Sequence, residues 1–253
     1  MQADIRTFNS FKIHATSAIT AVTAQNTLGV QCVQALSADF VEAQVRSVTA
    51  DFTVAACKTG MLATATTVER IVALARDGLL PHLVVDPVLV STSGDLLMAD
   101  GGVAAYRDAL FAYAEVITPN VHEAAVLCGV AVGDVRTVDD LTNLAKSLWS
   151  LGPTYVVVKG GHLTRAHSAQ ISSDVIVGRD QCVVLESPRV ATFNDHGTGC
   201  TLSAAIASGL ALGFGPLDAV REAKSFVHRA LKGARTWQLG AGRGPVDHLG
   251  WEV

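Results

Sequence analysis

The stretch LVVDP at residues 83–87 joins three apolar, strand-forming residues to an aspartate and a proline. The same order, an apolar run followed by a polar turn, recurs in VITPN at residues 116–120 and in YVVVKGG at residues 155–161. Helix-compatible segments at residues 68–76, 102–112 and 138–149 lie between or beside these runs. Continuous apolar strands that alternate with helices predict a mostly parallel sheet covered on both faces. We therefore expect one α/β domain over residues 1–253.

The polar residues that end these three runs indicate where a ligand binds. Parallel sheets bind ligands beyond the carboxyl ends of their strands, so Asp86, Asn120 and Lys159 should gather at one edge. Glu123 lies one helical turn after Asn120, and two carboxylates with an amide near a phosphate suit Mg²⁺. Asn120 and Glu123 also fit a capping box, and the two roles can coexist. Lys159 either reaches phosphates or simply emerges from its strand.

The octapeptide NDHGTGCT at residues 194–201 follows a β-like run and opens a helix-compatible segment at residues 202–212. Its two glycines before a helix predict an anion site made of backbone N–H groups and the helix dipole. Cys200 falls in the first turn, where the pKa of a thiol tends to be lowered, which predicts a base or a nucleophile. The alternative is a glycine turn before a helix that carries a buried cysteine. His196 either orients a phosphate or completes the turn.

Two further stretches are candidates for ligand recognition. Residues 20–27 predict a strand that ends in amides, and Gln25 has the paired donor and acceptor that match a heteroaromatic ring. Met61 follows a glycine and suits packing on a flat ring, although methionine more commonly fills a core. Further along, residues 175–177 and 182–185 predict an antiparallel hairpin, and residues 216–237 predict the last helix.

Composition excludes several classes of protein. The chain has 253 residues, of which 49% are hydrophobic and 17% charged, so disorder is excluded. A net charge of −4 without a basic block argues against nucleic-acid binding. No apolar run is long enough to span a membrane, and the first residues do not resemble a signal peptide. Five cysteines without metal-type spacing indicate reduced thiols, so we expect a cytoplasmic protein.

Seven motifs occur in an order that resembles a known family. They span nearly the whole chain: QNT at 25–27, KTGML at 58–62, DPV at 86–88, SGD at 93–95 with Leu97, TPN with Glu123 at 118–123, VKGGH at 158–162 and HGTGCTLS at 196–203. As a set they resemble the hydroxymethylpyrimidine/phosphomethylpyrimidine kinases of thiamine biosynthesis, within the ribokinase-like superfamily. Cys200, where most ribokinase relatives carry aspartate, narrows the resemblance to this branch and to the related pyridoxal kinases. The sequence GPVDH at residues 244–248 is similar to that branch as well.

The resemblance implies a ribokinase-like three-layer sandwich and a Mg²⁺-dependent transfer of the γ-phosphoryl group of ATP. The acceptor would be the hydroxymethyl group of an aminopyrimidine and then the resulting monophosphate. A cytoplasmic homodimer is also implied. The implied residue roles are as follows: Cys200 as the base, Gly197, Thr198 and Gly199 as N–H donors to the phosphoryl group, Asp86 and Glu123 for Mg²⁺, Lys159, His196 and Asn120 for ATP, and Gln25, Asp4, Met61 and Val88 for the pyrimidine.

The chain departs from the family pattern in two places. Relatives have a strand and a glycine-rich turn ahead of the Gln-Ala-Asp that here is Gln2-Ala3-Asp4. The resemblance therefore leads us to expect that this strand is missing. Its loss would expose a sheet edge and open the site. A misassigned start or a truncation explains the missing strand better than a natural short form. Asp195 replaces the usual threonine, and its carboxylate either repels the nucleotide or shares the Mg²⁺. A pyridoxal kinase and a catalytically impaired binding protein remain rival hypotheses.

Overall fold

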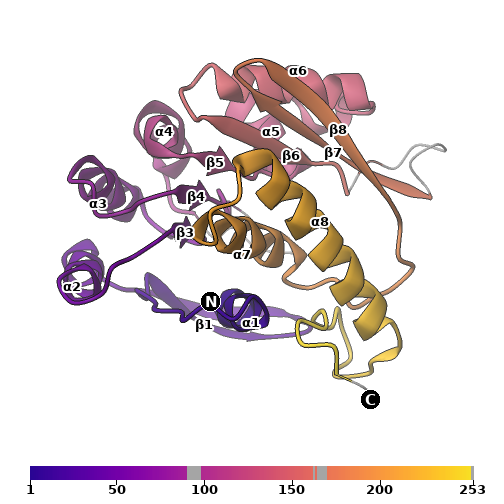
Figure 1. Cartoon of the computed structure of the whole chain (residues 1–253), viewed down its shortest axis with the longest axis horizontal. Helices are drawn as coiled ribbons and strands as arrows, with labels where there is room; N and C mark the ends of the chain where they lie inside the picture. The colour runs from indigo at the N-terminus through magenta and orange to yellow at the C-terminus, as the bar shows by residue number, and fades with distance from the viewer. Residues whose placement is uncertain (90–97, 162, 164–169, 252–253) are drawn as a thin grey trace.

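In the computed structural model, a six-stranded sheet has the order β3-β4-β5-β6-β7-β8 (Figure 1). The structure describes residues 1–89, 98–161, 163 and 170–251, so the SGD motif with Leu97 and the histidine of VKGGH lie outside the described residues. The strands are β3 (Cys57–Thr59), β4 (Leu83–Val85), β5 (Val116–Ile117), β6 (Tyr155–Lys159), β7 (Ile171–Gly178) and β8 (Gln181–Pro188). Strands β3 to β6 pair in parallel, and β7 and β8 add an antiparallel hairpin. This confirms the predicted mostly parallel sheet and hairpin.

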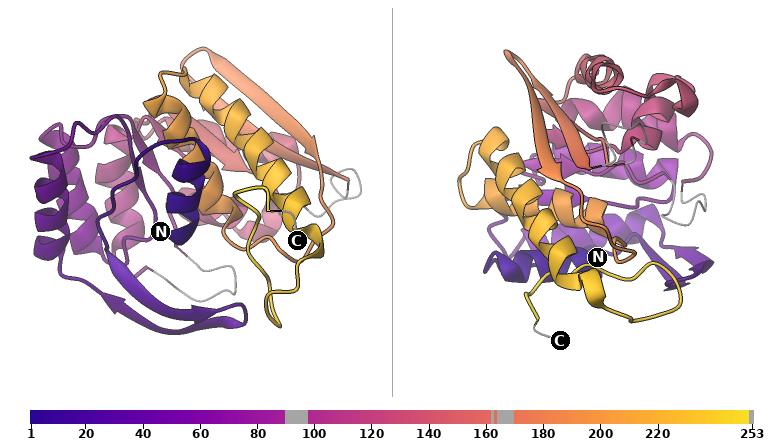
Figure 2. Two further views of the ribbon diagram at one scale, coloured as in Figure 1. Left: turned by 60° about the horizontal axis from the view of Figure 1, so that its bottom comes forward. Right: turned by 90° about the vertical axis from the view of Figure 1, so that its right-hand side faces the viewer.

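Alternate residues of the central strands enter two different cores. Val85, Ile117 and Val156 pack in one cluster, whereas Val84 and Val116 pack in the other. Successive side chains of a strand point to opposite faces, so buried strands need a helical layer on each side. Figure 2 shows these layers, with two long helices near the C-terminus on one face and the helices from the middle of the chain on the other. The expected three-layer arrangement is confirmed.

The ranges predicted at residues 68–76, 138–149, 202–212 and 216–237 each overlap a helix of the structure, whereas the two helices nearest the N-terminus are not among the predicted ranges. The helices are α1 (Gln2–Ser10), α2 (Ala38–Thr49), α3 (Ala65–Arg76), α4 (Gly102–Ala105), α5 (Val121–Cys128), α6 (Val138–Trp149), α7 (Thr198–Ala211) and α8 (Pro216–Gly233). The predicted helix at 102–112 is divided, because α4 continues as a π-helical turn, η1 (Tyr106–Leu110), and a 3₁₀ turn, η2 (Phe111–Tyr113). A 3₁₀ turn, η3 (Val132–Asp134), precedes α6. Another, η4 (Ala234–Thr236), follows α8, which ends earlier than predicted.

A separate two-stranded sheet lies outside the central one. Strand β1 (Ala21–Asn26) pairs antiparallel with β2 (Gly29–Ala35), which confirms the strand predicted at residues 20–27. The tip of this hairpin contacts the loop after η4, where the Gly242 N–H donates to Thr27 Oγ1 at 3.2 Å (Figure 2, left). Among the residues that the structure describes, β3 is the strand at one edge of the six-stranded sheet. In the described part of the chain, none of the helices combines the length and the apolar character that crossing a membrane requires.

Candidate active site

Asp86 and Lys159 form a buried ion pair at the carboxyl ends of β4 and β6. Lys159 Nζ donates to Asp86 Oδ1 at 2.9 Å, and the Thr118 hydroxyl donates to the same oxygen at 3.1 Å. Asp86 is only 1% exposed. Its burial alone would raise the pKa of the carboxyl, but Lys159 and Lys58 lower it below its ordinary value. Two of the three predicted strand-end residues therefore meet, as expected.

Asn120 and Glu123 occupy the first turn of α5, beside this ion pair. The Asn120 side chain accepts from the Glu123 N–H at 2.9 Å, and Glu123 Oε2 accepts from the Asn120 N–H at 2.7 Å, which completes a capping box. The backbones of Asn120 and Lys159 also form an isolated parallel β-bridge, which joins the start of α5 to β6. Burial raises the pKa of Glu123 to about 7; Lys159 opposes this rise and Asp86 adds to it. All four predicted strand-end and capping residues thus share one neighbourhood.

Helix α7 points its amino end at the same place. Gly197 adopts the left-handed φ of +84° as the N-cap, and no side chain in the described structure caps the first turn. A Cβ atom on Gly199 would lie 3.1 Å from Lys159 Nζ and 3.9 Å from Asp86 Oδ2, so a glycine lets the helix approach the ion pair. Ser203, one turn further on, donates to Asp86 Oδ2 at 3.3 Å. The helix starts at Thr198, before the segment that the sequence suggested, and uncapped N–H groups here suit an anion.

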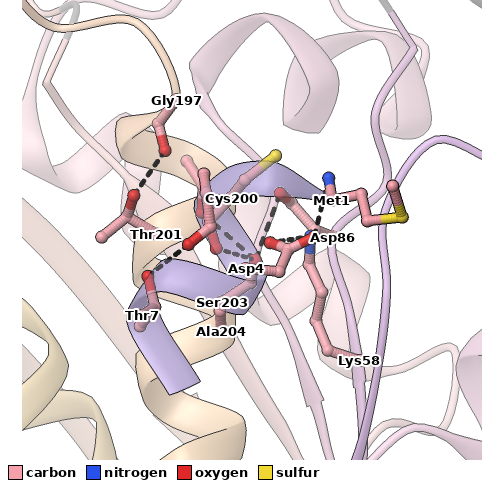
Figure 3. A network of polar contacts seen from close by, with 12 residues as sticks. Met1, Asp4, Thr7, Lys58, Asp86, Gly197, Cys200, Thr201, Ser203 and Ala204 are labelled. Atoms are coloured by element: carbon pink, nitrogen blue, oxygen red, sulfur yellow. Dashed lines mark hydrogen bonds and ion pairs between the residues drawn. The ribbon is translucent and has the colours of Figure 1, made fainter. Parts of the chain in front are cut away.

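Cys200 lies in this first turn, above Lys58 and Asp4 (Figure 3). Lys58 is 3% exposed in its side chain and donates to Asp4 Oδ1 at 3.0 Å. Lys58 lowers the pKa of the Cys200 thiol, but burial and the carboxylates of Asp86 and Asp4 outweigh it, and the net pKa is raised. The prediction of a lowered thiol pKa is therefore wrong, because burial and two nearby carboxylates together outweigh the charge of Lys58.

The four residues predicted to bind a pyrimidine lie on one helix, on one strand and in the loops after two other strands. Asp4 belongs to α1 and joins the polar network through Lys58. Val88 and Met61 are half-buried beyond the ends of β4 and β3, where the Val88 N–H donates to the Asp86 carbonyl at 2.8 Å. Gln25 is exposed on β1, and its described hydrogen bond, 3.5 Å long, comes from the Thr23 hydroxyl. The structure thus brings Asp4, Met61 and Val88 to the strand ends and leaves Gln25 on the separate hairpin.

Residues before the helix are held by the C-terminal loop. The His196 N–H donates to the Gly244 carbonyl at 3.0 Å, so its backbone helps to build the turn. Asp195 accepts two hydrogen bonds from the Arg243 guanidinium, one of them 2.7 Å long from Nε. Both expectations for Asp195 concern the nucleotide or Mg²⁺, and the structure adds Arg243 as a partner that neither includes.

Sequence reasoning missed several residues of this site. Lys58 was part of a quoted motif but received no role, and the hydroxyls of Thr118 and Ser203 were not considered. A weaker signal for Lys58 is present, since it lies one residue before the end of its strand and two before a glycine, whereas Lys159 ends its strand directly before a glycine. The signal for Arg243 was absent, because its partner lies 48 residues away in the chain.

Comparison with known proteins places this geometry in a family. The family model for phosphomethylpyrimidine kinase matches residues 1–247. The hydroxymethylpyrimidine/phosphomethylpyrimidine kinase of Rhizobium meliloti is 43% identical over 250 residues, which is 98% of this chain and 91% of the relative. A probable thiamine biosynthetic bifunctional enzyme of rice is 42% identical, and the alignment covers 98% of this chain but 45% of that larger protein.

A solved structure confirms the fold. The pyridoxal kinase of Bacillus subtilis, in an ADP complex, superimposes with a TM-score of 0.86 and 33% identity, covering 98% of this chain and 91% of that one. Its similarity confirms the ribokinase-like three-layer arrangement that the sequence predicted. With a family model over nearly the full length and relatives above 40% identity, the chain belongs to the phosphomethylpyrimidine kinase family.

Proposed function

We propose that this chain transfers the γ-phosphoryl group of ATP to the hydroxymethyl group of an aminopyrimidine and then to the monophosphate that results. The observation that supports this most is the close approach of the α7 N-terminus to a buried carboxylate–lysine pair, where a Cβ atom on Gly199 would lie 3.1 Å from Lys159 Nζ. Phosphoryl transfer depends on positioning and on charge compensation more than on covalent chemistry. Backbone N–H groups of Gly197, Thr198 and Gly199 would stabilise the charge on the moving group, and Lys159 would lie beside it.

Mg²⁺ fits the two carboxylates of this site. Burial and the charge of Asp86 raise the pKa of Glu123, and a divalent cation would relieve that repulsion. Mg²⁺ is usually held by one or two carboxylates together with phosphate oxygens and water. When bound, the ion would supply compensation for the phosphate charge. Asp86 and Glu123 would hold it, with Asn120 and His196 near the nucleotide.

Cys200 would take the proton of the substrate hydroxyl at Sγ. Only the thiolate can accept that proton, and the raised pKa makes it the minor form of the free group; Lys58 is the neighbour whose charge favours it. Lys58 would therefore stabilise the thiolate before the transfer, and accepting the substrate proton would convert Cys200 to the thiol. The pyrimidine would bind among Asp4, Met61 and Val88, and Gln25 would contribute only if the hairpin brings it over the ring.

The same proposal includes a homodimer of single-domain subunits that works in the reducing cytoplasm. All five cysteines lie in the described part of the chain and are unpaired, which supports a reducing compartment. Apolar side chains on the β1–β2 hairpin, namely Val22, Leu28 and Val33, are between 39% and 69% exposed, which supports a subunit contact there.

ADP release in the presence of Mg²⁺ and ATP tests the proposal, with hydroxymethylpyrimidine and pyridoxal offered in separate reactions. We expect faster turnover with the pyrimidine, in line with the sequence relatives. Faster turnover with pyridoxal would favour the activity named for the Bacillus subtilis structure instead. A rise in melting temperature with the pyrimidine but no ADP release would favour the binding-protein hypothesis.

A further inference from the structure

The turn before α7 carries an ion pair that the catalytic proposal does not use. Asp195 lies two residues before the N-cap, Gly197, and its carbonyl accepts from the Thr198 N–H at 3.3 Å. Both of its carboxylate oxygens accept from Arg243, in the two-pronged geometry that favours arginine over lysine. The side chain of Asp195 is 26% exposed and that of Arg243 is 53% exposed. A negative charge at the edge of the candidate phosphoryl site is thus matched by a cation from the C-terminal loop.

The backbone on both sides of Arg243 is fixed by contacts that need glycine. The Gly242 N–H donates to Thr27 Oγ1 on the β1–β2 turn, and the Gly244 carbonyl accepts from the His196 N–H. A Cβ atom on Gly242 would lie 2.0 Å from the Thr27 carbonyl oxygen, and one on Gly244 would lie 2.0 Å from Asn194 Oδ1. No side chain fits at either distance, so this loop has little room to shift. The guanidinium is therefore presented to Asp195 from an anchored backbone.

Without Arg243, Asp195 would have another set of partners within reach. Aspartate readily accepts hydrogen bonds from N–H groups at the start of a helix, and the dipole there favours a negative charge. In the described structure no side chain caps the first turn of α7. An unpaired Asp195 would compete with the phosphoryl group for the same N–H donors. It would also repel the phosphates across a partly exposed site.

We infer that Arg243 is a positioning residue for the nucleotide. By engaging both oxygens of Asp195, it keeps the amino end of α7 open to a phosphoryl group and cancels the added charge. This inference rests on the proposed function only in placing the phosphoryl group at that turn. It predicts that loss of Arg243 weakens nucleotide binding only while Asp195 is present. Nucleotide affinity should be restored when Asp195 is also replaced by an uncharged residue.

A double-mutant cycle tests the inference. The variants are Arg243→Ala, Asp195→Thr and the two combined, with Arg179→Ala, an exposed arginine on the β7–β8 turn, as the matched control. Affinity for ADP is measured by calorimetry, and KM for ATP and kcat are measured from product formation. Melting temperatures check the fold, and Arg243→Gln replaces Arg243→Ala if the smaller side chain unsettles the loop.

We expect Arg243→Ala to weaken ADP binding and raise KM for ATP about fivefold or more, with a smaller effect on kcat, since like charges near a phosphate act mainly on binding. Asp195→Thr and the double variant should stay within about twofold of the parent, because neither contains the carboxylate that Arg243 neutralises. Such non-additive effects of two substitutions are the mark of residues that interact. An equal loss in both backgrounds would overturn the inference. The inference would also be overturned if Arg243→Ala bound ADP as tightly as the parent while Gly199→Ala bound it more weakly. If neither substitution changed ADP affinity, the proposed phosphoryl site itself would be wrong.

Discussion

Replacing Asp86 with asparagine should destabilise the ligand-free protein strongly. The carboxylate is 1% exposed and pairs with Lys159 at 2.9 Å, and asparagine keeps its shape while removing the charge. Removing one partner of a buried ion pair leaves the other charge uncompensated, which costs about 3–5 kcal/mol. For a chain of this size each kcal/mol lowers the melting temperature by about 2–4 °C, so a fall of about 6–20 °C is expected.

A second substitution isolates the cause. In Asp86→Asn with Lys159→Met, no unpaired charge is left at that contact, so the double variant should regain most of the lost free energy of unfolding. Urea unfolding followed by circular dichroism measures all three variants, with Asp180→Asn on the exposed β7–β8 turn as the control.

The pH dependence gives an independent check. Because the folded-state pKa of Asp86 is below its unfolded value, its ionisation adds stability above the unfolded pKa, and this contribution is lost as pH falls through the folded pKa. The contribution of the Asp86 carboxylate to the difference between the parent and Asp86→Asn should therefore be complete above its unfolded pKa and shrink in acid. A loss below about 1 kcal/mol, or a double variant no more stable than Asp86→Asn, would refute the reasoning.

Three further predictions concern the same site. Gly197→Ala places alanine at a left-handed φ of +84° and should cost about 1–2 kcal/mol in urea unfolding; an unchanged midpoint would contradict this. The raised pKa of Cys200 predicts slower alkylation by iodoacetamide at pH 8 than at the exposed Cys182, measured by peptide mass spectrometry, and faster alkylation of Cys200 would count against it. The pKa of Glu123 is raised from 4.5 to about 7, so the folded protein holds its proton more tightly and the free energy of unfolding without ligand should fall as pH rises between these values. Glu123→Gln should remove that fall. Equal slopes of unfolding free energy against pH in the parent and in Glu123→Gln would contradict the raised pKa.

Much of the fold and part of the site follow from local sequence signals. The apolar runs that end at Asp86, Asn120 and Lys159 encode parallel strands, and parallel strands bring their carboxyl ends to one edge of a sheet. The spacing of Asn120 and Glu123 encodes a capping box, which the structure confirms. Such features depend on neighbours in the sequence or on the sheet as a whole. They are therefore visible before any contact is known.

Other features depend on contacts between distant segments. The pKa of Cys200 is set by Lys58, by burial and by the carboxylates of Asp86 and Asp4, all of which follow from the packing of distant segments, so the position of the thiol at a helix start predicted the wrong direction. The partner of Asp195 is not visible in the local sequence, because Arg243 reaches it from the C-terminal loop. In both cases the sequence names the groups, but the balance of charge around them is known only from the folded chain.

The measurement that tests the central claim most directly is mass spectrometry of the products formed from hydroxymethylpyrimidine, Mg²⁺ and ATP, with the parent chain and with Cys200→Ala. The account predicts that the parent forms the monophosphate and then the diphosphate, and that Cys200→Ala slows both steps by about 100-fold or more, as expected for loss of a general base. Absence of both products with the folded parent, or products formed at the parent rate by Cys200→Ala, would contradict it.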